Sequence, residues 1–231
     1  MLNTNYILLL FVTFLLASCQ TNPAKSDGNG LPSHAYLDGE GSTVGVVLCH
    51  GRGKHPTWFV VDPLLKGVHE QLGYHTLSIQ MPTGGSWRDY DVLFPDAYRR
   101  ITAAIRYLKQ EKKVKKVFLM GHSMGSRMAA AFLKEHTDAG VAGFIGVGMR
   151  SNGDPPLDAE TSLRMVNLPV LDVYGDGGDG EDAVHAVSRK DMVSDRYQQA
   201  FIPGAGHKFK KHEEELVDAV VSWLRKQESG K

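Results

Sequence analysis

The sequence of 231 residues has no excess of charge of either sign, because 26 Lys and Arg residues balance 26 Asp and Glu residues. A neutral chain gives no electrostatic basis for binding nucleic acid, so nucleic acid is not expected as a partner. His50, His55 and His122 could suggest a metal site, but the sequence lacks metal-ligand spacing of the H-E-x-x-H kind. We therefore expect no metal and no other cofactor. Internal repeats are absent too, and the length suits one domain with a sizeable core.

The sequence also lacks an apolar run long enough to span a bilayer comfortably as a helix. The longest run, YILLLFVTFLLA at residues 6–17, has the length of the apolar region of a secretory signal. It leads into Leu-Ala-Ser-Cys, ending at Cys19, which resembles the lipobox of bacterial lipoproteins, although no Lys or Arg precedes the run. The resemblance implies a signal peptide at residues 1–18 and lipidation of Cys19. Alternatives are an ordinary secreted protein cleaved near Ala17, or an uncleaved anchor.

Cysteine is scarce, since only Cys49 accompanies Cys19. If Cys19 carries lipid, Cys49 is a free thiol, and its place at the end of an apolar run predicts a buried and inert side chain. Residues 19–33 are polar and rich in small residues, which predicts a flexible tether, with the folded domain at 34–231. The expected location is the bacterial cell envelope, with membrane attachment through the lipid, facing the periplasm from the outer membrane in a Gram-negative host.

Short apolar runs alternate with helical patterns through the rest of the chain. Several runs are apolar on both faces, as strands buried in a parallel sheet are. The alternation predicts a mostly parallel, doubly wound α/β sheet with helices on both faces. The expected strands are 43–49, 75–81, 116–121, 141–148, 169–175 and 197–203, and the expected helices are 58–73, 96–113, 123–136, 181–195 and 211–227.

Chemically useful residues follow the predicted strands, at the edge of the sheet where such folds bind ligands. The strand at 116–121 runs into Gly121-His122-Ser123-Met124-Gly125 and at once into a helix. Such a sharp turn lifts the serine hydroxyl above the sheet, and glycines flank it because side chains there would clash. His122 is expected to be structural or to line the substrate site.

Three further segments complete a candidate site. The turn after the first strand, with Arg52 between two glycines, can offer a backbone N–H that joins the N–H of Met124 in an oxyanion hole. His207 stands in a glycine loop before the last helix, and Asp176 and Asp179 follow the strand at 169–175.

This order, oxyanion loop, serine, acid and histidine, resembles the α/β-hydrolase fold, over about residues 43–223. Within that fold, HGRGKHP, SIQMP and PVLDVYG look like an uncharacterised bacterial family. The resemblance implies a triad of Ser123, His207 and an aspartate. Its usual Gly-x-x-Asp pattern would put the acid at position 178, which is glycine here. We predict Asp179, with Asp176 as the alternative, and Asp182 could cap the next helix.

The resemblance implies a serine hydrolase acting on carboxylic esters or related acyl compounds. The alternative is a non-enzymatic envelope lipoprotein that uses the same scaffold for binding. The segment between the strands at 141–148 and 169–175 is short, so we expect little or no cap domain. Trp87, Tyr90 and Phe94 could line an acyl pocket, or pack in the core or on the surface. The sequence leaves the oligomeric state open.

Overall fold

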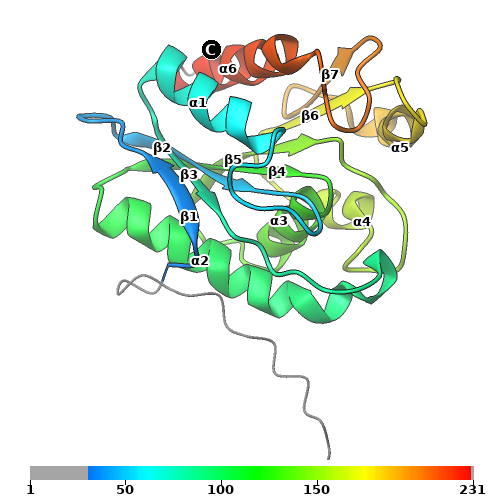
Figure 1. The fold of residues 1–231 in the computed structure, drawn as a ribbon, viewed down its shortest axis with the longest axis horizontal. Coiled ribbons are helices and arrows are strands. Elements are labelled where there is room, and N and C mark those ends of the chain that lie inside the picture. Colours follow the sequence, from blue (N-terminus) through cyan, green and yellow to red (C-terminus); the bar gives the residue numbers. More distant parts are fainter. Residues whose placement is uncertain (1–30, 230–231) are drawn as a thin grey trace, which may run out of the picture.

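A seven-stranded sheet forms the centre of the protein (Figure 1), as seen in a computed structural model that describes residues 31–229. The strand order is β1-β3-β2-β4-β5-β6-β7. All neighbouring strands are parallel except β1, which pairs antiparallel with β3 at one edge. The mostly parallel sheet predicted from the sequence is confirmed. The strands are β1 His34–Leu37, β2 Val44–Cys49, β3 His75–Ile79, β4 Lys116–His122, β5 Val141–Val147, β6 Val170–Gly175 and β7 Tyr197–Ile202.

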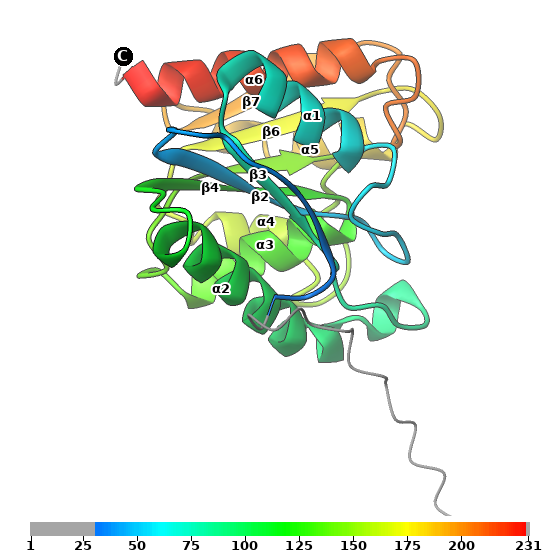
Figure 2. The ribbon, with the colours of Figure 1, turned by 60° about the vertical axis from the view of Figure 1, so that its left-hand side comes forward.

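Helices cover both faces of the sheet, which gives three layers (Figure 2). Helices α1 and α6 lie side by side on one face, while α2, α3 and α4 cover the other. The α-helices are α1 Val61–Leu72, α2 Phe94–Gln110, α3 Met124–Glu135, α4 Ala159–Leu163, α5 Glu181–Ser188 and α6 Glu213–Ser229. Three short 3₁₀ turns complete the described elements: η1 Trp87–Asp89, η2 Asp91–Leu93 and η3 Lys190–Met192.

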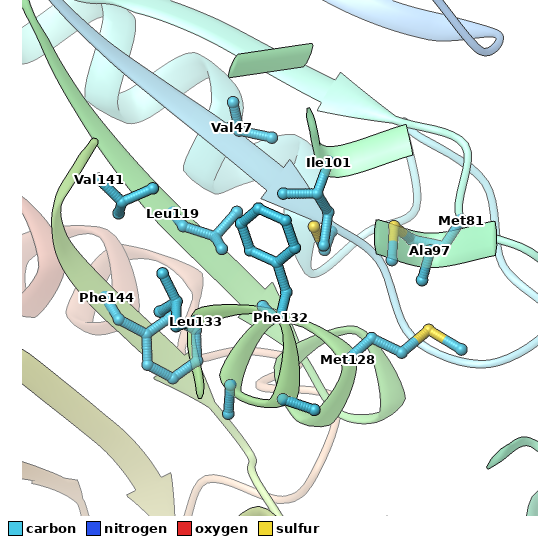
Figure 3. Close-up of a cluster of buried hydrophobic side chains, with 14 of the residues drawn as sticks. Val47, Met81, Ala97, Ile101, Leu119, Met128, Phe132, Leu133, Val141 and Phe144 are labelled. Atoms are coloured by element: carbon cyan, nitrogen blue, oxygen red, sulfur yellow. The ribbon is translucent and has the colours of Figure 1, made fainter. Parts of the chain in front are cut away.

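The larger core cluster lies between the sheet and helices α2 and α3 (Figure 3). Phe132 of α3 lies among Leu119 of β4, Val47 of β2 and Ile101 of α2, and none of these four is more than 1% exposed. Every residue of β2 is buried. Because a central parallel strand is covered on both faces, it is apolar throughout rather than alternating. The central strands can therefore be predicted from the sequence as continuous apolar runs.

The domain begins earlier than the sequence predicted. Leu31 is 1% exposed and belongs to the α2/α3 core cluster, and the carbonyl of Ser33 accepts a hydrogen bond from the N–H of Gln80. Residues 31–33, predicted as the end of a flexible tether, are therefore packed on the domain. Strand β1 was also missed, because its four residues are only half-buried and it is a strand only through its pairing with β3.

The C-terminal half differs from the prediction in helix lengths. The helix expected at 181–195 ends as α5 at Ser188 and is followed by η3. The segment after β5 contains the short helix α4, which was not predicted, but no further domain. The expectation of little or no cap domain is therefore confirmed. Residues 1–30, including the predicted signal peptide and Cys19, lie outside the described residues.

Candidate active site

Ser123 occupies a strained corner between β4 and α3. Its backbone angles are φ 55° and ψ −120°, outside the regions that a serine normally adopts. Helix α3 begins at the next residue, Met124, and the Ser123 N–H donates to the carbonyl of Val147 on β5. The corner therefore holds the Ser123 side chain at the carboxyl end of the sheet, where it remains half-buried.

The glycines around Ser123 are required by close backbone approach. A Cβ at Gly125 would lie 2.3 Å from the carbonyl oxygen of Cys49, and one at Gly121 would lie 2.5 Å from the Cα of Ser126. Both distances are far below van der Waals contact, so no side chain fits. Gly51, in the loop after β2, is also near: a Cβ there would lie 3.2 Å from the Cβ of Ser123.

His207 contacts Ser123 from the loop between β7 and α6. The Ser123 hydroxyl lies 2.9 Å from Nε2 of His207, so it donates to that nitrogen when Nδ1 carries the ring proton. His122 supports the loop, because its Nε2–H donates to the backbone carbonyl of His207 at 2.9 Å. The two rings lie with their centroids 5.0 Å apart. His122, expected to be structural or substrate-lining, is thus a structural neighbour of His207.

The carboxylate that meets His207 is Asp182. Its two oxygens lie 2.8 and 2.9 Å from Nδ1 of His207, and its side chain is 3% exposed. Asp179, predicted from the sequence, instead accepts from Arg150 and from the N–H of Glu181. The alternative Asp176 accepts from the N–H of Gly204 at 2.7 Å. The prediction of Asp179 is therefore wrong, as is its alternative.

The error has a local cause in the glycine-rich loop between β6 and α5. Gly178 and Gly180 both have positive φ, at 72° and 68°, so the loop follows a path that counting along the sequence does not reveal. Gly180 is the residue that precedes α5, and Asp182 stands in the first turn of the helix. The sequence does carry an acidic pair, Glu181 and Asp182, at this helix start, but nothing in it says which side chain turns inward.

The electrostatics of the site keep the acid ionised. Burial opposes ionisation of Asp182, but hydrogen bonds and charges from His207 and Arg150 outweigh burial and hold the pKa of its carboxyl below the ordinary value. At His122 burial is the dominant effect: it lowers the pKa of the ring to about 3, so this ring stays neutral. Burial also disfavours the charged form of Cys49, which is fully buried in β2, and therefore raises the pKa of its thiol. A buried, protonated thiol fits the predicted inert cysteine.

Two backbone N–H groups are candidates for an oxyanion hole. Met124 is the first residue of α3, so its N–H has no acceptor within the helix. Arg52 follows Gly51, whose carbonyl accepts from Nδ1–H of the buried His50 at 2.9 Å. In a trans peptide, C=O and N–H point in opposite directions, so this bond orients the Arg52 N–H away from His50. The two candidate donors thus belong to segments that flank Ser123.

The aromatic residues that were candidates for an acyl pocket pack against other side chains. Tyr90 and Phe94 are each 1% exposed and belong to the core, which decides between the two roles left open for them. Trp87 lies under the guanidinium of Arg127, at 5.7 Å. Within residues 31–229, no cluster of His, Cys, Asp and Glu could hold a metal ion, and no helix is long and apolar enough to cross a membrane.

The protein has the α/β-hydrolase fold, as its similarity to solved structures shows. Est1E from Butyrivibrio proteoclasticus with bound ferulic acid superposes with a TM-score of 0.68 at 16% identity, over 85% of this chain and 95% of that one. An α/β serine hydrolase homologue from Coxiella burnetii gives 0.68 at 20%, over 83% and 90%. A serine hydrolase without lid from Xanthomonas campestris gives 0.67 at 16%, over 84% and 88%.

The sequence itself matches a family over residues 96–226, more than half of the chain. The chain belongs to this family, described as protein of unknown function (DUF3530). No curated protein matches the sequence. The predicted α/β-hydrolase fold is confirmed by the structural neighbours, and the predicted likeness to an uncharacterised family agrees with the family match.

Proposed function

We propose that the protein is a serine hydrolase acting on carboxylic esters or related acyl compounds. The observation that carries the proposal is the continuous chain of contacts from Ser123 Oγ to Nε2 of His207 at 2.9 Å, and from Nδ1 of His207 to Asp182 at 2.8 Å. Nucleophile, base and orienting acid in this order are what acyl transfer through a serine requires.

The proposed mechanism assigns one step to each group. His207 takes the Ser123 proton at Nε2 while Oγ attacks the acyl carbonyl, and Asp182 stabilises the imidazolium that forms. The N–H groups of Met124 and Arg52 donate to the oxyanion of the tetrahedral intermediate. The intermediate expels the alcohol, which takes the proton from His207. Water, activated by the same imidazole, then releases the acid and frees Ser123.

Two features support a small acyl substrate and an open site. The segment between β5 and β6 contains only the five-residue helix α4, so no cap domain covers this side of the site. A fold neighbour, Est1E, is described with ferulic acid, a carboxylic acid of the kind that ester hydrolysis releases.

Labelling with a fluorophosphonate tests the proposal directly. The full chain in mild detergent should be labelled covalently at Ser123 and should cleave a short p-nitrophenyl ester. Ser123→Ala should abolish labelling and lower kcat by roughly 10⁴-fold or more. Ser126→Ala, in the same helix turn, is the matched control and should still label. A wild type that neither labels nor cleaves would favour the alternative, a binding lipoprotein with an inactive site.

We also propose that Cys19 carries lipid and attaches the domain to the membrane of a bacterial envelope. The support is the Leu-Ala-Ser-Cys sequence that follows the apolar run at residues 6–17. Metabolic labelling with an alkyne fatty acid should mark the wild type, while Cys19→Ser should remain unlabelled. Cys49→Ser is the control and should label normally; equal labelling of the Cys19→Ser variant would remove the proposal.

A further inference from the structure

Arg150 lies beside the acid of the candidate triad and contacts three carboxylates at once. It follows β5, and its Nε donates to Oδ1 of Asp182 at 2.9 Å. Its Nη2 lies 3.0 Å from Oδ2 of Asp179, and its Nη1 contacts Glu181. The side chain of Arg150 is only 19% exposed. Asp182 thus has two partners, the imidazole of His207 and the guanidinium of Arg150.

We propose that Arg150 is a positioning residue that fixes the rotamer of Asp182. This inference rests on the proposed function. Nε of Arg150 occupies one lone pair of Oδ1, which leaves the carboxylate few orientations in which it still reaches Nδ1 of His207. A planar guanidinium does this better than an ammonium, because its donors have fixed directions.

Arg189 fixes the backbone on both sides of Arg150. Arg189, fully buried, donates to the carbonyl of Met149 at 3.1 Å and to the hydroxyl of Ser151 at 2.7 Å, the two residues that flank Arg150. Arg189 is in turn paired with the fully buried Asp172 at 2.9 Å. The backbone that carries Arg150 is therefore anchored to β6, and Arg150 has little freedom to leave Asp182.

Arg150 also contributes one positive charge against the carboxylates of Asp179, Glu181 and Asp182. Of these three, only Asp182 contacts His207. Loss of the guanidinium therefore leaves Asp182 with its contact to His207 but without the partner that fixes its direction.

Separate values of kcat and KM in the full chain test the proposal, because a residue that positions the acid without touching the substrate acts on turnover and not on binding. Arg150→Gln should lower kcat about tenfold and leave KM unchanged. Arg150→Lys keeps the charge but not the planar fork, so it should also lower kcat. Arg164→Gln is the matched control, since Arg164 also bridges two acids, Glu160 and Asp191, on the surface.

Each outcome decides the proposal. An unchanged kcat in a folded Arg150→Gln variant overturns it, as does an equal change in Arg164→Gln. If Arg150→Gln does not fold, Arg150→Lys decides alone: a kcat unchanged from wild type overturns the positioning role. If the wild type hydrolyses no ester, the proposed function fails separately, and the NMR signal of the Nδ1 proton of His207, which faces Asp182, replaces kinetics. That signal should still shift in Arg150→Gln and not in Arg164→Gln.

Discussion

The two sides of the candidate site are held together by different interactions. On the nucleophile side, Ser123 is fixed by backbone geometry: a strained φ of 55°, and glycines whose absent side chains let α3 and the end of β2 approach. On the acid side, Asp182 is fixed by charged side chains, with Arg150 beside it and the buried pair of Arg189 and Asp172 behind. The glycines that avoid the clash lie within the corner, although Gly125 meets the backbone at the end of β2, whereas the ion pairs need side chains from distant segments.

The difference also concerns what each side tolerates. A glycine corner is strained when any side chain is added, because backbone atoms stand where its Cβ would be. An ion-pair network fails when one partner is removed, because the remaining charge stays buried without compensation. The predictions below test the two sides separately, beginning with the largest expected effect.

Removal of the acid should have the largest effect on turnover. Asp182→Asn should lower kcat about 10⁴-fold, because an amide at this position favours the wrong tautomer of His207. Asp179→Asn and Asp176→Asn are matched controls and should keep most activity, since neither carboxylate contacts His207. Ester hydrolysis is measured beside circular dichroism to show that each variant folds. High activity in Asp182→Asn together with loss in Asp179→Asn would restore the prediction made from the sequence.

Breaking the buried ion pair should have the largest effect on stability. Arg189→Met should lower the free energy of unfolding by about 3–5 kcal/mol, because Asp172 is 0% exposed and would keep an unpaired charge. The double variant Asp172→Leu with Arg189→Met should recover part of the loss, since it removes both charges. Urea denaturation gives the free energy of unfolding of the wild type, the single variant and the double variant. Arg164→Met, on an exposed pair, should change stability by no more than about 0.5 kcal/mol.

Adding one methyl group to the corner should act on the nucleophile side alone. Gly125→Ala should cost about 1–3 kcal/mol, or more if the backbone cannot shift, because its Cβ would meet the carbonyl oxygens of Cys49 and His50 at 2.3 and 2.5 Å. Gly85→Ala is the control, since no atom lies within 4 Å of the added carbon. Thermal denaturation compares the two. Equal stability of both variants would mean that the corner is not sterically constrained.

Acidification should weaken the nucleophile side through its neutral histidines. Burial lowers the pKa of His50 to about 4 and that of His122 to about 3. Because the unfolded chain binds protons at these positions near pH 6.5 and the folded protein does not, stability falls as pH decreases through that range. Between pH 7.5 and 5.5 each histidine should cost about 1 kcal/mol of unfolding free energy. His122→Asn should reduce this dependence, whereas the exposed His55→Gln should not.

The nucleophile side could be foreseen because its constraints are local. The change from an apolar strand to a helix across Gly121 to Gly125 indicated such a corner with Ser123 at its tip, because the glycines that the corner needs are part of the pattern. The buried strands β2 and β4 could likewise be predicted from their own residues, because each is a continuous apolar run. Strand β1 and the packing of Leu31 could not be foreseen, because both depend on partners, β3 and the core beside α2, that lie far along the chain.

The sequence by itself determined the alternation that folds into a parallel sheet, the serine at its glycine corner, and the histidine before the last helix. Only the tertiary structure decided which carboxylate reaches His207. From Gly175 to Asp182, four glycines and four acidic residues allow many backbone paths, and the choice among them comes from outside the segment. Arg150 from the end of β5 and Arg189 paired with Asp172 hold the two ends of α5, and that orientation turns Asp182 inward while Asp179 stays at the surface.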